Sequence, residues 1–359
     1  MRTVTVNLET RSYPIYIGSG LLQDPQIKLP LVGDEVLVVT NTTIAALYLP
    51  LLKARCTALN YHEVLLPDGE AYKDLNTLNQ IFDALLSQGH SRKTTLLALG
   101  GGVVGDMTGF AAACYQRGVA FVQIPTTLLA QVDSAVGGKT AVNHARGKNM
   151  IGSFHQPLAV ISDVDLLKTL PEREYAAGLA EVLKYGLIWD AQFFAWLEAN
   201  QVALNQRQAD ALIPAIARSC EIKAEIVSQD PTEQGIRAYL NLGHTFAHAI
   251  EQTAGYGRLL HGEAVAIGLC LALDLSQQLG LIEAELTQRT KAWLRAVGLP
   301  VQVPTACRNQ DLMAAMALDK KRDGKVQKFI VLRSLGHAEI RAGIDPASIE
   351  RVLDAGREC

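Results

Sequence analysis

Short, almost wholly apolar segments recur through the first 165 residues and restrict the folds open to this chain. They are rich in β-branched residues, and each is too short for a typical helix. Strands this apolar are usually covered on both faces, as in a parallel sheet between helices. A helical pattern at residues 74–89 separates two of them, so we expect an α/β domain that binds ligands at the carboxyl ends of its strands. The segments are EVLVVT (35–40), HEVLL (62–66), TTLLALG (94–100), AFVQIP (120–125) and LAVIS (158–162).

The pattern changes after about residue 170, where apolar residues follow helical spacing in most segments. A chain of 359 residues is long enough for two domains, because domains typically contain about 100 to 200 residues. We therefore predict an α/β domain over residues 1–168 and a helical domain over residues 169–359. Residues 328–342, KFIVLRSLGHAEIRA, are the exception and predict a β-hairpin.

Charge and cysteine content exclude several classes of protein. The net charge is -3 and the isoelectric point is about 6.3, so we expect neither nucleic acid nor a membrane surface as a partner. The six cysteines are scattered without a C-x-x-C pair, which predicts reduced thiols in a cytoplasmic protein. The first residues lack the apolar block of a signal peptide, and no apolar stretch is long enough for a membrane span.

A glycine-rich turn follows the apolar segment that ends at residue 100. Gly100, Gly102 and Gly105 satisfy G-x-G-x-x-G, a pattern in which the backbone approaches a diphosphate at a helix N-terminus. Tight strand-to-helix turns also contain glycine for steric reasons, so both interpretations stay open. The acidic residue expected about 20 positions later is absent, since position 125 is a proline. A dinucleotide would therefore bind in a variant manner.

Two further segments place charged side chains among glycines and small residues. The first, PDGEAYKD (67–74), could contact a ribose or a phosphate, although a solvated turn is the alternative. The second, residues 123–157, suits a phosphorylated or carboxylated substrate because lysine offers a point charge and three donors. An ordinary surface loop is the alternative there. The candidate residues are Glu70 and Lys73 in the first segment, and Asp133, Lys139, Lys148 and Asn149 in the second.

Three of the eight histidines lie within 18 positions and suggest a metal site. A catalytic zinc site typically has three protein ligands and one open position. His244 and His248 are one helical turn apart, and this spacing alone favours them as a ligand pair. His261 is a further candidate. Glu181 lies within an apolar helical pattern, where an unpaired charge is costly, and competes with Glu263 for the role of carboxylate ligand.

Taken together, these blocks resemble the 3-dehydroquinate synthase family over residues 35–335. No single block is decisive, but their number and order are specific. The blocks are PDGEAYK, GGGVVGDMTGF, YQRGV, IPTTLLAQVDSAVGGKTAVNH, GKNMIGSFHQP, GLAEVLKYG, NLGHTFAHAIE, LHGEAVAIG and LDKKRDGK.

The resemblance implies an N-terminal NAD-binding α/β domain and an all-α C-terminal domain that binds zinc or cobalt, with the active site between them. It implies Glu181, His244 and His261 as the metal ligands, and it assigns His248 to the substrate instead. It also implies a homodimer. The implied NAD contacts are Asp68, Gly69, Glu70, Ala71, Tyr72, Lys73, Gly102, Val103, Val104, Gly105, Asp106, Thr126, Thr127, Lys139, Lys148, Leu166, Leu167, Lys168 and Thr169. The implied substrate contacts are Arg117, Asp133, Lys139, Lys148, Asn149, Lys184, Lys223, Arg237, Asn241, His248 and either Lys320 or Lys321.

The implied reaction converts 3-deoxy-D-arabino-heptulosonate 7-phosphate to 3-dehydroquinate and phosphate, on the shikimate route to the aromatic amino acids. It proceeds by transient oxidation with NAD, phosphate elimination, re-reduction, ring opening and intramolecular aldol closure. The leaving phosphate is a candidate for the base that removes the proton, because the implied site is rich in cations and poor in an obvious general base.

Three alternatives differ in what they predict. A metal-dependent polyol dehydrogenase would share the two domains and the metal but would form NADH stoichiometrically. A sister sugar phosphate cyclase would act on a neutral sugar phosphate, whereas Lys223, Arg237, Asn241 and His248 keep the dehydroquinate synthase identity. A sensor that reuses the fold would lose at least one metal ligand, and all three are present.

Overall fold

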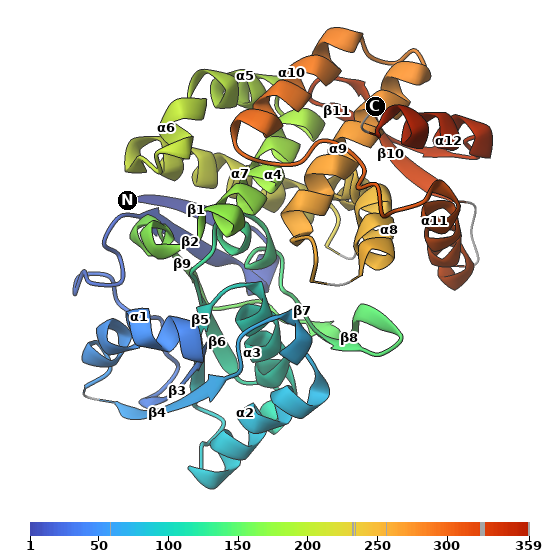
Figure 1. Ribbon diagram of the computed structural model, residues 1–359. Helices are drawn as coiled ribbons and strands as arrows, with labels where there is room; N and C mark the ends of the chain where they lie inside the picture. Colours follow the sequence, from blue (N-terminus) through green and yellow to red (C-terminus); the bar gives the residue numbers. More distant parts are fainter. Residues whose placement is uncertain (58, 232, 234, 256, 324–326, 358–359) are drawn as a thin grey trace. The chain divides into compact units, whose positions relative to one another are not determined.

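The computed structural model describes residues 1–57, 59–231, 233, 235–255, 257–323 and 327–357, and the side chains of residues 318–323 lie outside that description (Figure 1). The chain forms two compact units. The first unit contains Met1–Leu170 and Ala209–Ser228, and the second contains Pro171–Gln208 and Gln229–Cys359. The sequence predicts one boundary at residue 168, whereas helix α7 (Ala209–Gln229) groups with the first unit.

The first unit is built on a seven-stranded sheet in the order β1-β2-β9-β6-β5-β3-β4. Strand β1 pairs antiparallel with β2, and the other pairings in this sheet are parallel. The five predicted strand segments are β3, β4, β5, β6 and β9, so the α/β prediction is confirmed. The strands are β1 (Arg2–Val6), β2 (Tyr13–Gly18), β3 (Glu35–Asn41), β4 (Asn60–Leu66), β5 (Thr95–Gly100), β6 (Ala120–Pro125) and β9 (Val160–Asp163), with a separate hairpin of β7 (Lys139–His144) and β8 (Gly147–Phe154).

Helices cover both faces of this sheet, which explains why its inner strands β3, β5 and β6 are apolar on both sides (Figure 1). Alternate residues of a strand point to opposite faces. In β5, Leu96 and Ala98 pack in one core cluster with α2 (Leu75–Ser87) and α3 (Gly102–Cys114). Leu97 and Leu99 pack in a second cluster with α1 (Thr42–Ala54). This arrangement buries all six residues of β5.

The carboxyl ends of the parallel strands bring separate loops of the first unit to one edge of the sheet. The segment after β4 contains Asp68–Lys73, and the glycine-rich turn follows β5. Thr126 and Thr127 follow β6, and residues 166–169 follow β9. Because parallel strands end on the same side, these four predicted cofactor segments share this edge, whereas the predicted cofactor residues Lys139 and Lys148 lie in the separate hairpin of β7 and β8.

The second unit is helical apart from one hairpin, which confirms the predicted class of the C-terminal part. Helix α9 lies at its centre and packs against α4, α8, α10, α12 and β10. No helix among the described residues is both long and apolar enough to cross a bilayer. The elements are α4 (Glu172–Ile188), α5 (Ala191–Ala199), α6 (Gln201–Asn205), α8 (His244–Ala254), α9 (His261–Gln278), α10 (Ala284–Ala296), α11 (Asn309–Asp323), β10 (Lys328–Ser334), β11 (His337–Ala342) and α12 (Pro346–Ala355).

Candidate functional site

Three helices of the second unit bring a carboxylate and two imidazoles together. Glu181 lies in α4, while His244 and His261 are the first residues of α8 and α9. One ligand atom from each lies within 4.8 Å of the others. Nε2 of His244 is 3.6 Å and Nε2 of His261 is 3.7 Å from Oε1 of Glu181. This donor set of two nitrogens and one oxygen suits zinc or a similar divalent ion.

The opposite nitrogen of each ring faces a hydrogen-bond acceptor. Nδ1 of His244 is 3.2 Å from the carbonyl oxygen of Leu242, and Nδ1 of His261 is 3.5 Å from Oε2 of Glu251. A proton on Nδ1 can therefore be donated outward, which leaves the Nε2 lone pair directed at Glu181. Outer partners of this kind orient the histidines of metal sites.

Glu181 is fully buried, and its surroundings fit a bound cation. Its Oε1 accepts no hydrogen bond from any described residue, while Nζ of Lys184 forms an ion pair with Oε2. A buried carboxylate oxygen without a donor is costly unless a cation compensates it. A metal bound at Oε1 and the two Nε2 atoms would provide that compensation.

The two candidate histidines have pKa values shifted in opposite directions. Burial lowers the pKa of His244 well below its ordinary value, and the charges of Lys184, His261 and His248 act in the same direction. Burial also lowers the pKa of His261, but the hydrogen bond and charge of Glu251 outweigh it, so the net shift is upward. A neutral His244 is in the form that a metal requires.

Two glycines of α9 let its neighbours approach closely enough to form this cluster. A Cβ at Gly262 would lie 2.0 Å from the carbonyl oxygen of Ala177, one turn before Glu181 in α4. A Cβ at Gly268 would lie 2.2 Å from the carbonyl oxygen of Gly243, the residue before His244. Any larger side chain at either position would push α9 away from a ligand-bearing segment.

The structure distinguishes between the alternatives that sequence spacing left open. The His248 ring is 5.6 Å from that of His244 and 6.3 Å from that of His261, but His248 is not part of the three-residue set. Glu263 is occupied elsewhere: Arg173 donates to both of its oxygens, and the backbone N–H of Leu260 donates to Oε2 at 2.8 Å. Glu263 thereby fixes the first turn of α9, and the structure favours Glu181 as the carboxylate ligand.

Other predicted substrate residues of the second unit lie near its helix ends. Arg237 is buried and donates from Nη1 to the carbonyl oxygen of Pro231 at 2.6 Å. Nδ2 of Asn241 donates to Oε1 of Glu233 at 2.8 Å. Lys320 and Lys321 lie in α11, but their side chains fall outside the described part of the structure.

In the first unit, α7 contributes a buried lysine. Nζ of Lys223 is 2.6 Å from both the backbone oxygen and Oδ1 of Asp133. The thiol of Cys220, one turn earlier, donates to the carbonyl oxygen of Gln131 at 3.3 Å. These contacts explain why α7 groups with the first unit, and they bring two predicted substrate residues together.

A second lysine joins predicted cofactor and substrate residues. Nζ of Lys73 donates to Oδ2 of Asp106 at 2.5 Å and to Oδ1 of Asn149 at 2.6 Å. Burial raises the pKa of Asp106, although the charge of Lys73 opposes the shift. The structure thus links the loop after β4, the first turn of α3 and strand β8. Lys139 and Lys148 belong to β7 and β8 of the same hairpin.

The remaining predicted cofactor segments are held by local contacts. A Cβ at Gly105 would lie 2.5 Å from Oε1 of Gln123, so the steric interpretation of this glycine also holds. Asp68 accepts hydrogen bonds from Asn41 and Thr43, both at 2.7 Å. The other predicted positions occupy the same loops: Gly69, Ala71 and Tyr72 after β4; Gly102, Val103 and Val104 at the start of α3; Thr126 and Thr127 after β6; and Leu166, Leu167, Lys168 and Thr169 after β9.

Arg117 is the predicted site residue of the first unit that the fold does not place with the others. It follows α3 and precedes β6, so it lies at the amino end of that strand. The register pairs Thr95 with Ala120 and Gly100 with Pro125, which puts the glycine-rich turn at the opposite edge of the sheet.

The sequence interpretation missed residues that contact predicted site residues. Glu251 ends the NLGHTFAHAIE block, and its helical spacing of seven from His244 could have indicated it. Glu233 and Asn143 contact Asn241 and Asn149, respectively, through their side chains. Neither of these two lies at a spacing that would identify it.

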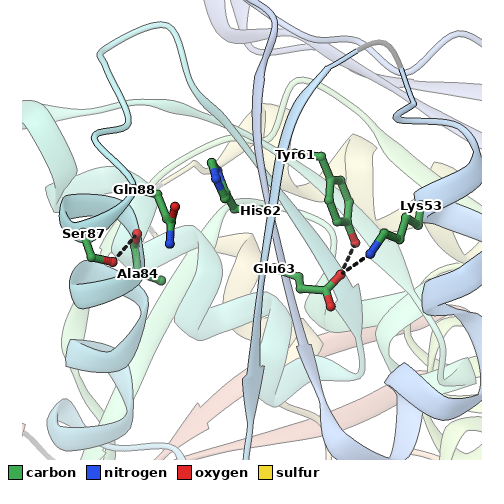
Figure 2. Close-up of a pocket in the computed structure, with 7 residues that line it drawn as sticks. All are labelled: Lys53, Tyr61, His62, Glu63, Ala84, Ser87 and Gln88. Atoms are coloured by element: carbon green, nitrogen blue, oxygen red, sulfur yellow. Dashed lines mark hydrogen bonds and ion pairs between the residues drawn. The ribbon is translucent and has the colours of Figure 1, made fainter.

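A pocket of about 390 Å³ opens elsewhere on the first unit (Figure 2). Its lining contains none of the predicted site residues. Figure 2 shows the Tyr61 hydroxyl and the Lys53 ammonium directed at Glu63, at 2.7 and 3.8 Å. The lining residues are Lys53, Tyr61, His62, Glu63, Ala84, Ser87 and Gln88.

Comparison with known proteins shows the family to which the chain belongs. Residues 63–177 match the family model of the 3-dehydroquinate synthase N-terminal part, and residues 178–322 match that of the C-terminal part. The chain belongs to the 3-dehydroquinate synthase family. A family member from Saccharophagus degradans, named 3-dehydroquinate synthase, is 60% identical over 323 residues, which are 89% of each chain.

Two solved structures share this family's fold over nearly the whole chain. A 2-epi-5-epi-valiolone synthase from Streptomyces hygroscopicus subsp. jinggangensis, with NAD⁺ and Zn²⁺ bound, has a TM-score of 0.90 at 30% identity and 99% coverage of both chains. A 2-deoxy-scyllo-inosose synthase complexed with carbaglucose-6-phosphate, NAD⁺ and Co²⁺ has a TM-score of 0.90 at 25% identity. It covers 99% of this chain and 100% of its own.

Proposed function

We propose that this protein converts 3-deoxy-D-arabino-heptulosonate 7-phosphate to 3-dehydroquinate and phosphate. The 60% identity to a relative named 3-dehydroquinate synthase carries this choice, because the two sister cyclases are only 30% and 25% identical. The enzyme is a phosphate-eliminating carbon–oxygen lyase of the shikimate pathway. The buried cluster of Glu181, His244 and His261 supports the metal dependence that this chemistry uses.

The metal would be held by Glu181, His244 and His261 of the second unit. A bound zinc or cobalt ion supplies a Lewis acid that polarises the hydroxyl undergoing oxidation. Lys184, paired with Oε2 of Glu181, holds this carboxylate in place and would add a positive charge beside the metal. Both metals are supported by the two solved structures, one of which holds Zn²⁺ and the other Co²⁺.

NAD would be held by the loops at the carboxyl ends of the first unit's strands. Bound NAD supplies reversible hydride transfer, so the complete reaction has no net redox change. The first turn of α3 offers backbone N–H groups to the diphosphate, because Gly101 precedes the helix and provides no side-chain cap. Residues of the segment Asp68–Lys73 would bind the ribose and adjoining groups.

The basic side chains would bind the phosphate and carboxylate of the substrate. The candidate cations are Lys139, Lys148 and Lys223 in the first unit and Lys184 and Arg237 in the second, and lysine and arginine suit anionic groups. Asp133 orients Lys223 through the 2.6 Å contact. Lysine and arginine contacts hold the substrate in one geometry, which lowers the entropic part of the barrier.

The leaving phosphate would itself act as the base in the elimination. Two carboxylates lie beside these cations, and each already forms an ion pair with a lysine: Asp133 with Lys223 and Glu181 with Lys184. Neither carboxylate is therefore an obvious general base. In this step the proton beside the ketone moves to a phosphate oxygen while the carbon–oxygen bond to phosphate breaks. A non-hydrolysable phosphonate analogue tests it: the analogue should exchange this proton with solvent on the enzyme, and failure to exchange would count against the proposal.

A phosphate-release assay tests the function as a whole. Purified protein with NAD should release phosphate from the heptulosonate, lose this activity after chelation, and regain it with zinc or cobalt. Turnover of a neutral sugar phosphate in preference to the heptulosonate would instead indicate a sister cyclase. Net formation of NADH would indicate a polyol dehydrogenase.

The assembly and location rest on family expectation. We propose a homodimer in the cytoplasm. Light scattering coupled to size-exclusion chromatography should give twice the 38.8 kDa mass of one chain. A single-chain mass at micromolar concentration would contradict the dimer.

A further inference from the structure

The hairpin of β7 and β8 is irregular at Asn143. Pairing is regular from Lys139↔Phe154 to Val142↔Ile151, and the register then shifts before His144. The backbone N–H of Asn143 donates across to the carbonyl oxygen of Lys73 at 2.7 Å. Between these last two pairs β7 has one residue, Asn143, whereas β8 has three, so the additional residues lie in β8 around Asn149.

The Asn143 side chain makes two further bonds of opposite polarity. Its Nδ2 donates to Oε1 of Glu70 at 2.8 Å, and its Oδ1 accepts from the backbone N–H of Asn149 at 2.9 Å. Asn149 has a positive φ of 54°, which is uncommon outside glycine. Oδ1 of Asn149 in turn accepts from Nζ of Lys73 at 2.6 Å. Asn143, Asn149 and Lys73 therefore form a ring of hydrogen bonds, to which Glu70 is joined through Asn143.

We propose that Asn143 is a positioning residue that couples the loop Asp68–Lys73 to Asn149. The inference rests on the proposed function, in which that loop binds NAD and Asn149 binds substrate. Asn143 is bonded on one side to Glu70 and Lys73, and on the other to the backbone that sets the direction of Asn149. Ordering the loop around NAD thereby orders Asn149 for the substrate.

Linkage gives this coupling a measurable form. If NAD tightens the binding of substrate by some factor, the substrate must tighten the binding of NAD by the same factor. In this proposal the two side-chain hydrogen bonds of Asn143 transmit the coupling, and the acceptor of one of them is the carboxylate of Glu70. We expect Asn143→Ala to reduce the coupling factor by about tenfold.

The experiment measures the dissociation constant of NAD by calorimetry in the metal-loaded enzyme, with and without a phosphonate analogue of the heptulosonate that lacks the hydroxyl undergoing oxidation and so cannot react with NAD. The ratio of the two constants is the coupling factor. Asn79→Ala is the matched control, because Asn79 is exposed and donates from Nδ2 to Asp83 at 3.1 Å within α2. It should leave the factor at the wild-type value.

A polarity exchange separates positioning from mere stability. Asn143→Asp keeps the acceptor for Asn149 but places a carboxylate against Glu70, so the factor should fall. Adding Glu70→Gln places a side-chain amide, which can donate a hydrogen bond, opposite the new carboxylate at position 143. The double variant should therefore have a larger coupling factor than Asn143→Asp alone.

Each outcome bears on the inference. A wild-type factor near one, or an unchanged factor in Asn143→Ala, overturns it. If Asn143→Ala does not fold, failure of the double variant to recover coupling also overturns it, and recovery supports it. Failure of the proposed function is distinguishable, because the wild-type enzyme would then not release phosphate from the heptulosonate.

Discussion

Replacing Glu251 with glutamine should weaken metal binding without removing a proposed ligand. Oε2 of Glu251 is 3.5 Å from Nδ1 of His261, whose Nε2 faces Glu181. Loss of such an outer partner typically costs about 10- to 100-fold in metal affinity. Because 3.5 Å is a long contact and glutamine still offers an acceptor oxygen, we expect about tenfold, or about 1.4 kcal/mol.

Competition with a fluorescent zinc chelator measures this affinity in the folded protein. Glu285→Gln is a suitable control, since Glu285 is exposed and its nearest cation is Arg289 at 4.0 Å. The control should match the wild type, and both variants should retain the wild-type melting temperature without metal to within a few degrees. An unchanged zinc affinity in Glu251→Gln would refute the argument that this carboxylate orients His261.

Four further predictions follow from contacts and burial. Gly262→Ala should lower the free energy of unfolding by about 1 to 3 kcal/mol and reduce zinc content, because its Cβ would lie 2.0 Å from the carbonyl oxygen of Ala177; chemical denaturation and metal analysis test this. Glu181→Gln should reduce bound zinc and abolish phosphate release while the circular dichroism spectrum is unchanged, and full activity would contradict its assignment. Chelation should lower the melting temperature of the wild type more than that of Glu181→Gln, which differential scanning calorimetry measures. Burial raises the pKa of Cys220 and of Cys270 to about 12, so at pH 8 both thiols stay protonated and should resist iodoacetamide in the native protein, whereas exposed Cys114 should be alkylated before these two; peptide mass spectrometry reads the order.

The sheet could be predicted from sequence because the segments that form its strands are almost wholly apolar, and such segments are usually buried on both faces. Six consecutive buried residues in β5 leave little choice but a strand covered on both faces. The hairpin of β10 and β11 was predicted on similar grounds and is present. The grouping of α7 with the first unit was not predictable. An amphipathic pattern shows that one face is buried, but it does not say against which unit.

The metal site could also be predicted only in part, because local sequence patterns do not show which distant segments come together. A charge within the apolar pattern around Glu181 correctly pointed to a special carboxylate, which the structure places beside His244 and His261. Local spacing favours His248 over His261, because His248 is one helical turn from His244 whereas His261 lies in another helix. The approach of His261 depends on the contact of Gly262 with Ala177, between segments 85 positions apart in sequence. Asn143 was missed because a shift in strand register leaves no periodic signal in the sequence.

The number of product molecules formed per NAD tests the central claim most directly. Metal-loaded enzyme would be stripped of NAD, supplied with a limiting amount of it and given excess heptulosonate, and 3-dehydroquinate, phosphate and NADH would be measured together. The account predicts equal amounts of dehydroquinate and phosphate, many of each per NAD, with no accumulation of NADH. Product that stops at one molecule per NAD, with an equal amount of NADH, would contradict it.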